Sequence, residues 1–261
     1  MLEYFLFKNS KLTDEDWDKF VEQSDNGTLF HKRAFLKYHP KDRFRDASFY
    51  VTKNGKLLSV FTAALIERDG KKILASHPGA SYGGFVYKSD LNFKEAHELV
   101  DILIEYGSSF KADRIQLTIP PIIYQTKYSN YIDFALYRKG FAYLKRDVSS
   151  IVQLDFDKDR LLETFRAEAR TATKKAVRQG IEIVECELFD EYYQILKKNL
   201  KLRHNVNPAH TLEELKLLKK MFPAKIRLWG AFLREKLTAG VCNFSVNSNV
   251  VLAFYISHDE A

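Results

Sequence analysis

The sequence predicts a mixed α+β protein made of two halves with similar element order. Short runs rich in β-branched and aromatic residues are joined by Asn-Gly at 54–55 and Asp-Gly at 69–70, which favour two-residue β-hairpin turns. Segments with apolar residues at helical spacing, such as 93–111, alternate with these strands. After Gly180 the element order of the first half begins again, although no residue-level repeat is visible.

The composition is that of a folded, basic protein. Of its 261 residues, 46% are hydrophobic and 29% are charged, which suits one large domain or two smaller ones. The formal net charge of +7 favours anionic partners such as nucleic acid, nucleotide-linked precursors or an anionic membrane surface. Cys186 and Cys242 form no CxxC pair and the histidines show no metal-ligand spacing, so we expect no metal. No apolar run approaches the roughly 20 residues that cross a bilayer, and we expect a cytoplasmic protein without a transmembrane segment.

The first half reads as a strand, two helices, a strand meander, and then alternating helices and strands. Helix starts are indicated by Thr13, Thr28 and Asn92, whose side chains can accept hydrogen bonds from free backbone N–H groups. The expected strands are 3–7, 47–53, 56–67, 71–76, 85–87 and 114–119, and 141–155 is expected to be largely extended. A further helix is expected over 127–138.

Between two of these strands lies a glycine-rich segment with Tyr82, Gly83 and Gly84. The two glycines permit a close approach of the backbone. They indicate either a bulge where strands diverge or a wall of a ligand cleft.

The stretch 154–184 predicts a strand end, a long helix and a new strand. Asp157 or Asp159 can cap the helix, and Gly180 can end it in the left-handed conformation. An apolar stripe on this helix is accompanied by a cationic row, which consists of Arg166, Arg170, Lys174 and Arg178, with Lys175 beside it. The row is either a solvated face or a surface that meets phosphates.

The second half repeats the pattern with a strand at 181–187, a helix at 189–203 and a helix that starts at Thr211. A hairpin follows over 225–246 with Glu235-Lys236 as its turn, and then a strand at 250–256. We therefore expect two domains, 1–155 and 156–261. The second half ends before the helix that follows the fourth strand of the first half, so the second domain is either truncated or degenerate, and we favour a truncated domain whose natural chain continues.

The motif Arg170-x-x-x-Lys174-Lys175-Ala176-x-x-x-Gly180 resembles the R-x-x-x-[KR]-K-A-x-x-x-G-[VI] helix of FemAB-type acyltransferases, which belong to the GNAT-like (acetyltransferase-fold) superfamily. The segment 28–36 and the Tyr-Gly-Gly at 82–84 are similar to further elements of that family. The resemblance implies tandem GNAT-like halves, each a mixed, mostly antiparallel sheet flanked by helices.

The resemblance also implies an N-acyltransferase that transfers an acyl or aminoacyl group to an amine of a cell-wall or polysaccharide precursor. Its donor would be aminoacyl-tRNA or acyl-coenzyme A, with no permanently bound cofactor. Its partners would be an anionic small molecule or nucleotide-linked precursor and tRNA. The implied substrate-binding residues are Lys37, Tyr82, Gly83, Gly84, Arg170, Lys174, Arg203, Tyr255 and Ser257.

Structural interpretations of these residues stay open. Arg203 also suits a helix C-terminus, where a cation interacts favourably with the helix dipole, and Tyr255 suits a core. No catalytic dyad is evident, and Asp259 and Glu260 are candidate bases only by their position.

Two other functions remain open. The first is a coenzyme A-dependent N-acetyltransferase, and the second is a non-catalytic module that binds an anionic ligand or tRNA. The segment YKSDLNFKEA at 87–96 has no glycine, so we expect no coenzyme A pyrophosphate loop in the first half. The stretch 180–261 contains no helical-hairpin arm of the kind found in tRNA-using cell-wall enzymes. This departure argues against synthesis of cell-wall bridges in particular and leaves N-acyl transfer as the more general prediction.

Overall fold

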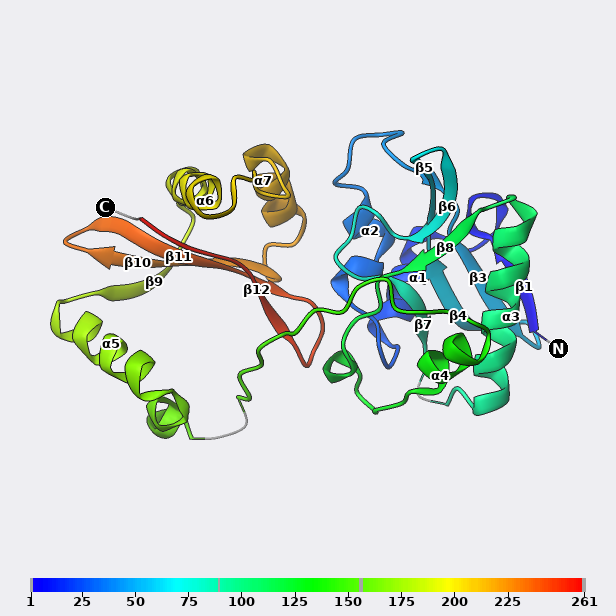
Figure 1. Cartoon of the computed structure of the whole chain (residues 1–261), viewed down its shortest axis with the longest axis horizontal. Coiled ribbons are helices and arrows are strands. Elements are labelled where there is room, and N and C mark those ends of the chain that lie inside the picture. Colours follow the sequence, from blue (N-terminus) through cyan, green and yellow to red (C-terminus); the bar gives the residue numbers. More distant parts are fainter. Residues whose placement is uncertain (1, 89, 155–156, 260–261) are drawn as a thin grey trace. The chain divides into compact units, whose positions relative to one another are not determined.

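A computed structural model describes residues 2–88, 90–154 and 157–259 (Figure 1). The chain forms two compact units: the first contains Met1–Ala142 and Ser245–Leu252, and the second contains Tyr143–Phe244 and Ala253–Ala261. By these contacts, residues 143–155 go with the second unit, and the connection between the last two strands goes with the first. As domain boundaries, the expected 1–155 and 156–261 stay a prediction.

The first unit contains two four-stranded sheets. One has the order β1-β3-β4-β7 and is antiparallel throughout; the other has the order β2-β5-β6-β8 and is antiparallel except for the parallel pair β6 and β8. The strands are β1 (Leu2–Leu6), β2 (Arg45–Asp46), β3 (Phe49–Lys53), β4 (Lys56–Thr62), β5 (Ala64–Arg68), β6 (Lys71–Ser76), β7 (Gly84–Tyr87) and β8 (Arg114–Leu117). The helices are α1 (Asp14–Glu22), α2 (Arg33–Leu36), α3 (Phe93–Ser109) and α4 (Tyr131–Arg138), with short 3-10 turns at Phe7–Asn9, Leu29–His31 and Ile122–Tyr124.

The sheet β1-β3-β4-β7 is packed on both faces. Because side chains alternate along a strand, Phe61 and Phe85 point into one cluster, which they share with α3 and α4. Their neighbours Val60 and Val86 point into the opposite cluster, together with Trp17 of α1. Burial on two sides explains why these strands read as nearly continuous apolar runs.

The local signals of the first unit are confirmed at its turns and helix starts. Asn54 and Asp69, like the glycine after each, have positive φ, as the expected hairpin turns require. Thr13 and Asn92 each form a capping box with the third residue of α1 and α3. The helix expected from Thr28 is instead a 3-10 turn at Leu29–His31 followed by the one-turn helix α2.

The second unit has one antiparallel sheet with the order β12-β11-β10-β9. Helices α6 and α7 lie on one face of this sheet (Figure 1). Its elements are a 3-10 helix at Lys158–Thr164, α5 (Ala167–Arg178), β9 (Glu182–Cys186), α6 (Phe189–His204), α7 (Leu212–Met221), β10 (Ile226–Leu233), β11 (Lys236–Ser245) and β12 (Val251–His258). Thr211 caps α7 as predicted, whereas the β10–β11 turn has Arg234 and Glu235 at positive φ, one residue before the expected pair.

The prediction of one long helix from Asp157 or Asp159 to Gly180 is wrong. The chain makes a 3-10 helix, becomes extended at Arg166 (φ −57°, ψ 151°), and only then begins α5, without a side-chain cap. Asp157 therefore does not cap α5, and the Asp159 side chain lies outside the described residues. None of the α5 residues is buried, so tertiary packing does not hold one continuous helix together. Gly180, with φ +79°, ends α5 as predicted.

No helix in the described ranges is both long enough and apolar enough to span a membrane.

Candidate functional site

The parallel strands β6 and β8 diverge in the first unit. They are paired up to Ser76 and Leu117, and the Gly83 N–H still donates to the Thr118 carbonyl oxygen (2.8 Å), after which β7 continues beside β4. Open sheets tend to bind ligands where neighbouring parallel strands separate at their carboxyl ends. The end of the β6–β8 pairing is therefore a candidate ligand site.

The root of this divergence is closed by the protein itself. The Asn26 side chain donates to the Phe85 carbonyl oxygen (2.7 Å) and accepts from the Tyr87 N–H (3.0 Å). The Asp25 N–H donates to the Tyr87 carbonyl oxygen (2.8 Å). On the edge of β7 that faces away from β4, the Phe85 carbonyl and both backbone groups of Tyr87 are thus already hydrogen-bonded, which disfavours pairing with an extended ligand.

Tyr82, Gly83 and Gly84 lie where β6 and β7 meet. A Cβ on Gly83 would come within 2.6 Å of the Ser76 backbone, and Gly84 has φ +104°, so the backbone itself requires both glycines. The Tyr82 ring packs edge-on against Phe30 (5.9 Å between centroids) and Tyr124 (5.2 Å). The close approach of Gly83 to the Ser76 backbone and the positive φ of Gly84 account for the glycines, and a role in ligand binding stays a prediction.

Lys37 follows α2 and has an exposed side chain. Its ammonium forms an ion pair with Asp14 of α1 (2.6 Å). The nearby His31 is fully buried, and its Nδ1 lies 2.9 Å from the Thr28 hydroxyl. Burial lowers the pKa of His31 to about 4, so this ring is neutral at pH 7 and acts as part of the core.

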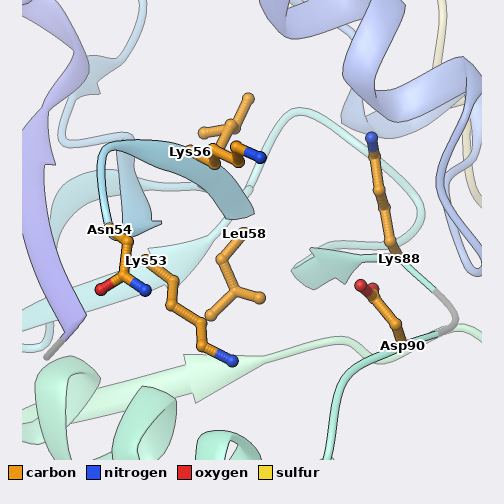
Figure 2. Close-up of a pocket in the computed structure, with 7 residues that line it drawn as sticks. Lys53, Asn54, Lys56, Leu58, Lys88 and Asp90 are labelled. Carbon is orange, nitrogen blue, oxygen red and sulfur yellow. The ribbon is translucent and has the colours of Figure 1, made fainter.

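Two pockets on the first unit share Lys88. The smaller pocket, about 360 Å³, is shown in Figure 2, where the side chains of Lys53 and Lys56 come from the β3–β4 hairpin and those of Lys88 and Asp90 from the segment after β7. Lys53 is already paired with Glu95 (2.5 Å). The second pocket, about 380 Å³, extends from Lys88 to Tyr128 and Tyr131.

In the second unit, Tyr255 is held in the core by His210. Its hydroxyl accepts from the His210 N–H (3.1 Å) and lies 2.8 Å from the His210 Nδ1. Tyr192 donates to the Tyr255 carbonyl oxygen (3.0 Å). Burial raises the pKa of Tyr255 to about 12, so the phenol stays protonated at neutral pH and cannot act as a base.

Ser257 lies two residues further along β12 and faces the same side of the strand. It is buried, and its Oγ has no hydrogen-bond partner within the described residues. A buried hydroxyl without a partner is costly, which marks this position as one where a ligand or a water molecule would be bound favourably.

Arg203 lies in the last turn of α6, and its Nη2 is 3.2 Å from His258 Nε2 at the end of β12. In the same unit Arg170 is half-buried and donates to the Phe165 carbonyl oxygen (3.2 Å), while Lys174 is exposed. Arg170 and Lys174 thus come from α5, and Arg203 comes from α6.

Asp259 is not a free base. Its carboxylate accepts from Lys198 (3.0 Å) and Lys236 (3.4 Å), and the hydrogen bond from Lys198 is the largest cause of its lowered pKa. Glu260 lies outside the described residues.

The predicted residues fall into both units. Lys37, Tyr82, Gly83 and Gly84 belong to the first unit, and Arg170, Lys174, Arg203, Tyr255 and Ser257 belong to the second. Sequence reasoning missed Asn26, which reads as part of an Asn-Gly helix end, and His210, which is one of seven scattered histidines. Asn26 bonds Phe85, 59 residues away, and His210 bonds Tyr255, 45 residues away, so only the folded structure reveals these hydrogen bonds.

The fold of the whole chain is that of a tandem GNAT-like protein, with two mixed units of mostly antiparallel strands and flanking helices. In particular, the chain has the fold of FemX: its structure matches the crystal structure of FemX with a TM-score of 0.60 over 88% of this chain, at 17% sequence identity. The chain spans 57% of the FemX chain. The FemAB-like fold expected from the sequence is thereby confirmed.

Other solved structures are less similar to this chain, with TM-scores below 0.4. They include a transcriptional regulator from Bacillus halodurans C-125 (TM-score 0.38, 12% identity, 58% of this chain and 100% of that chain). Another is the GCN5-related glucosamine N-acetyltransferase region of a fungal multi-domain GH3 β-N-acetylglucosaminidase (TM-score 0.39, 11% identity, 93% of this chain and 28% of that chain). No protein-family model and no curated protein matches the chain.

Proposed function

We propose that this protein is an N-acyltransferase that transfers an acyl or aminoacyl group to an amine of a cell-wall or polysaccharide precursor. The observation that carries the proposal is the FemX fold over 88% of the chain. The helix motif that ends at Gly180 adds support, since the structure keeps α5 and its glycine stop.

The proposed acceptor is an anionic, nucleotide-linked precursor. Lys37 in the first unit and Arg203 in the second are exposed cations, and each would bind a phosphate or carboxylate of such a precursor. The guanidinium of Arg203 can pair with two oxygens at once, whereas the ammonium of Lys37 acts as a point charge. The Asp14 partner of Lys37 is itself partly exposed, so the lysine can exchange it for a ligand. Tyr82 in the first unit, and Tyr255 and Ser257 in the second, are the other residues that the resemblance assigns to substrate binding.

The proposed donor is aminoacyl-tRNA. Arg166, Lys174 and Arg178 of the cationic row are exposed, and no salt bridge joins them to a carboxylate within the described ranges. Unpaired cations along one helix suit a polyphosphate backbone, which gains from counterion release.

Two features argue against a coenzyme A site in the first unit. The β7 edge is occupied by Asn26, and the α3 N-terminus is capped by Asn92 and carries the Glu95 carboxylate. A pyrophosphate would have to displace this carboxylate from the positive end of the helix dipole.

In the proposed reaction the acceptor nitrogen attacks the acyl carbon of the donor ester. The new C–N bond forms, the ester C–O bond breaks, and the nitrogen proton passes to solvent while the released ribose hydroxyl regains one. Positioning of the two substrates supplies much of the acceleration in such transfers. No side chain is assigned as the base.

The test is transfer of a radiolabelled acyl group from aminoacyl-tRNA to a UDP-linked muropeptide, with acetyl-coenzyme A as the second donor. We expect label to move from aminoacyl-tRNA and the rate to fall at least tenfold in Arg203→Ala, since loss of a charge-assisted pair costs about 1.5–3 kcal/mol. Lys201→Ala, an exposed cation in the same helical turn, should keep its rate.

Each other result has a defined meaning. Transfer from acetyl-coenzyme A alone would replace this donor with the coenzyme A-dependent alternative. Salt-sensitive tRNA binding without transfer to any acceptor would favour the non-catalytic module and overturn the proposed activity.

A further inference from the structure

Both backbone groups of Gly79, in the segment between β6 and β7, are hydrogen-bonded to histidine rings. The Gly79 N–H donates to the Nδ1 of His77 (3.2 Å), and the Gly79 carbonyl oxygen accepts from the Nε2 of His39 (2.7 Å). His77 directly follows β6, whereas His39 comes after α2 and lies 40 residues before Gly79 in the chain. One local and one long-range hydrogen bond therefore meet at a single residue.

The hydrogen-bond partners determine which nitrogen of each ring carries a proton. A carbonyl oxygen only accepts, so His39 is protonated on Nε2, and an N–H only donates, so the Nδ1 of His77 is unprotonated. The guanidinium of Arg43 also only donates, and it lies 3.5 Å from the Nδ1 of His39, which favours the neutral ring. Burial lowers the pKa of His77 to about 4, so this ring is neutral at pH 7 as well.

The packing around Gly79 leaves no room for a side chain. A Cβ at this position would come within 2.1 Å of the His39 Nε2 and within 2.6 Å of the Phe44 ring. The Phe44 ring itself meets both histidines edge-on, with centroids 4.9 Å from His39 and 5.1 Å from His77. Glycine is therefore the residue that lets both imidazoles bond the same stretch of backbone.

This contact joins the two segments of the first unit that carry predicted substrate-binding side chains. Lys37 lies two residues before His39, and Tyr82 lies three residues after Gly79. A series of ring contacts connects the same two segments, from Tyr82 through Phe30, Phe35 and Tyr38 to His39. The placement of Tyr82 relative to Lys37 thus depends on how firmly the segments are held together.

We propose that His39 and His77 are positioning residues, which clamp Gly79 from both of its backbone groups and thereby hold Tyr82 in place relative to Lys37. The inference rests on the proposed function, because the resemblance alone assigns Lys37 and Tyr82 to substrate binding. Neither histidine touches the acceptor or the reacting atoms in this role. Loss of the clamp should therefore raise the KM for the acceptor and leave kcat nearly unchanged.

The first measurement is hydrogen exchange at the backbone amides of the full chain at pH 7, which needs no substrate. In His39→Ala the Gly79 amide should exchange about tenfold faster, although this variant removes only the partner of the Gly79 carbonyl oxygen. The Ala80 amide, which donates to the His77 carbonyl oxygen (3.1 Å), should accelerate with it. His39→Gln, whose side-chain amide can replace the Nε2 donor, should restore slow exchange.

The second measurement is the acceptor KM in transfer to the UDP-linked muropeptide. His77→Ala should raise this KM about tenfold and change kcat by less than about twofold, since one lost hydrogen bond has an effect of this order. His77→Asn should keep the wild-type KM, because its side-chain oxygen accepts from the Gly79 N–H as Nδ1 does. Gly79→Ala displaces the His39 ring and should resemble His77→Ala.

The matched control is His97→Ala. His97 lies on α3 in the same unit, where its ring packs on Phe93 (4.7 Å between centroids). This variant should change neither the acceptor KM nor exchange at the Gly79 amide. A thermal midpoint well above the assay temperature verifies that each variant is folded.

Two results would overturn the clamp. One is an unchanged Gly79 amide in His39→Ala, and the other is failure of both His39→Gln and His77→Asn to restore the wild-type behaviour, which would assign the losses to ring packing. If transfer occurs and its KM is the same in His77→Ala, the positioning role fails while the transferase stands. If the wild-type chain transfers no acyl group, the proposed function fails and the role toward the acceptor fails with it, whereas hydrogen exchange still decides whether the histidines hold Gly79.

Discussion

The main sheets of the two units differ in how they are covered. In the first unit, Phe61 and Val60 are adjacent residues on opposite faces, and both are buried. In the second unit, Leu228 is fully buried toward α6 and α7, whereas its neighbour Trp229 is 37% exposed. Ile256 of β12, beside buried Tyr255, is 68% exposed. A two-sided core thus stabilises the first sheet, and a one-sided core stabilises the second.

The difference is expressed in sequence as well as in structure. The β4 and β7 strands are apolar at successive positions, which is typical of a sheet buried on both faces. Along β10 the buried Ile226 and Leu228 alternate with exposed Arg227 and Trp229, which is typical of one buried face. The stability cost of a substitution should therefore depend on which face of the second sheet it lies on, whereas substitutions on either face of the first sheet should be costly.

The largest effect is expected at Phe61. Phe61→Ala removes a buried ring that stacks on Phe49 (5.0 Å between centroids) and should destabilise the first unit by about 3–5 kcal/mol. Val60→Ala, one residue away on the other face, should also cost more than about 1 kcal/mol. Urea unfolding measures both, and a neutral Val60→Ala would contradict the two-sided core.

The second sheet offers a test on adjacent residues. Leu228→Ala should cost about 2–5 kcal/mol, whereas Trp229→Ala should cost much less because part of its ring already contacts water. The measurement is urea unfolding followed by the circular dichroism of both variants. Equal losses would mean that the outer face of this sheet is packed as tightly as the inner one.

Acid should act on the first unit before the second. His31 and His77 both lie in the first unit, and burial lowers the pKa of each to about 4. Unfolded histidine titrates near pH 6.5, so the stability from these neutral rings is present above pH 6.5 and is lost as pH falls toward 4. In that window each ring should contribute a slope of about 1.4 kcal/mol per pH unit.

The two tryptophans allow each unit to be followed separately, because Trp17 lies in the first and Trp229 in the second. With Trp229→Phe as background, Trp17 fluorescence should report unfolding at lower urea as pH falls from 6.5 to 4. His31→Asn and His77→Asn should flatten this dependence. An unchanged slope in the double variant would contradict the role of the two histidines.

Asn26 should have an intermediate effect. Asn26→Ala leaves the Phe85 carbonyl and the Tyr87 N–H without partners in a buried place, at a cost of about 1–3 kcal/mol. Asn26→Asp keeps the acceptor for Tyr87 N–H and removes only the donor. Hydrogen exchange at the Tyr87 amide should therefore accelerate in Asn26→Ala and much less in Asn26→Asp, and equal acceleration would contradict the bidentate role.

The features that sequence predicts well are those set by neighbouring residues. The hairpin turns after Lys53 and Arg68, the caps at Thr13, Asn92 and Thr211, and the α5 stop at Gly180 depend on local backbone preferences. The break in the helix at Arg166 could not be predicted, because helical spacing indicates an apolar face but not whether another element packs against that face. The candidate site shows the same limit: Tyr255 was identified by resemblance, but its partner His210 is 45 residues away.

The smallest effect is expected at Ile256, where the comparison is most sensitive. Since 68% of this residue is exposed, Ile256→Thr removes little buried area and keeps a β-branched side chain suited to a strand. The free energy of unfolding should change by less than about 0.5 kcal/mol. Ser257→Ala, one residue away on the buried face, removes a hydroxyl that has no partner in the described chain and should stabilise the unit slightly. If Ile256→Thr instead costs as much as a core substitution, the outer face of the second sheet is covered in solution, and the contrast between the two sheets fails there.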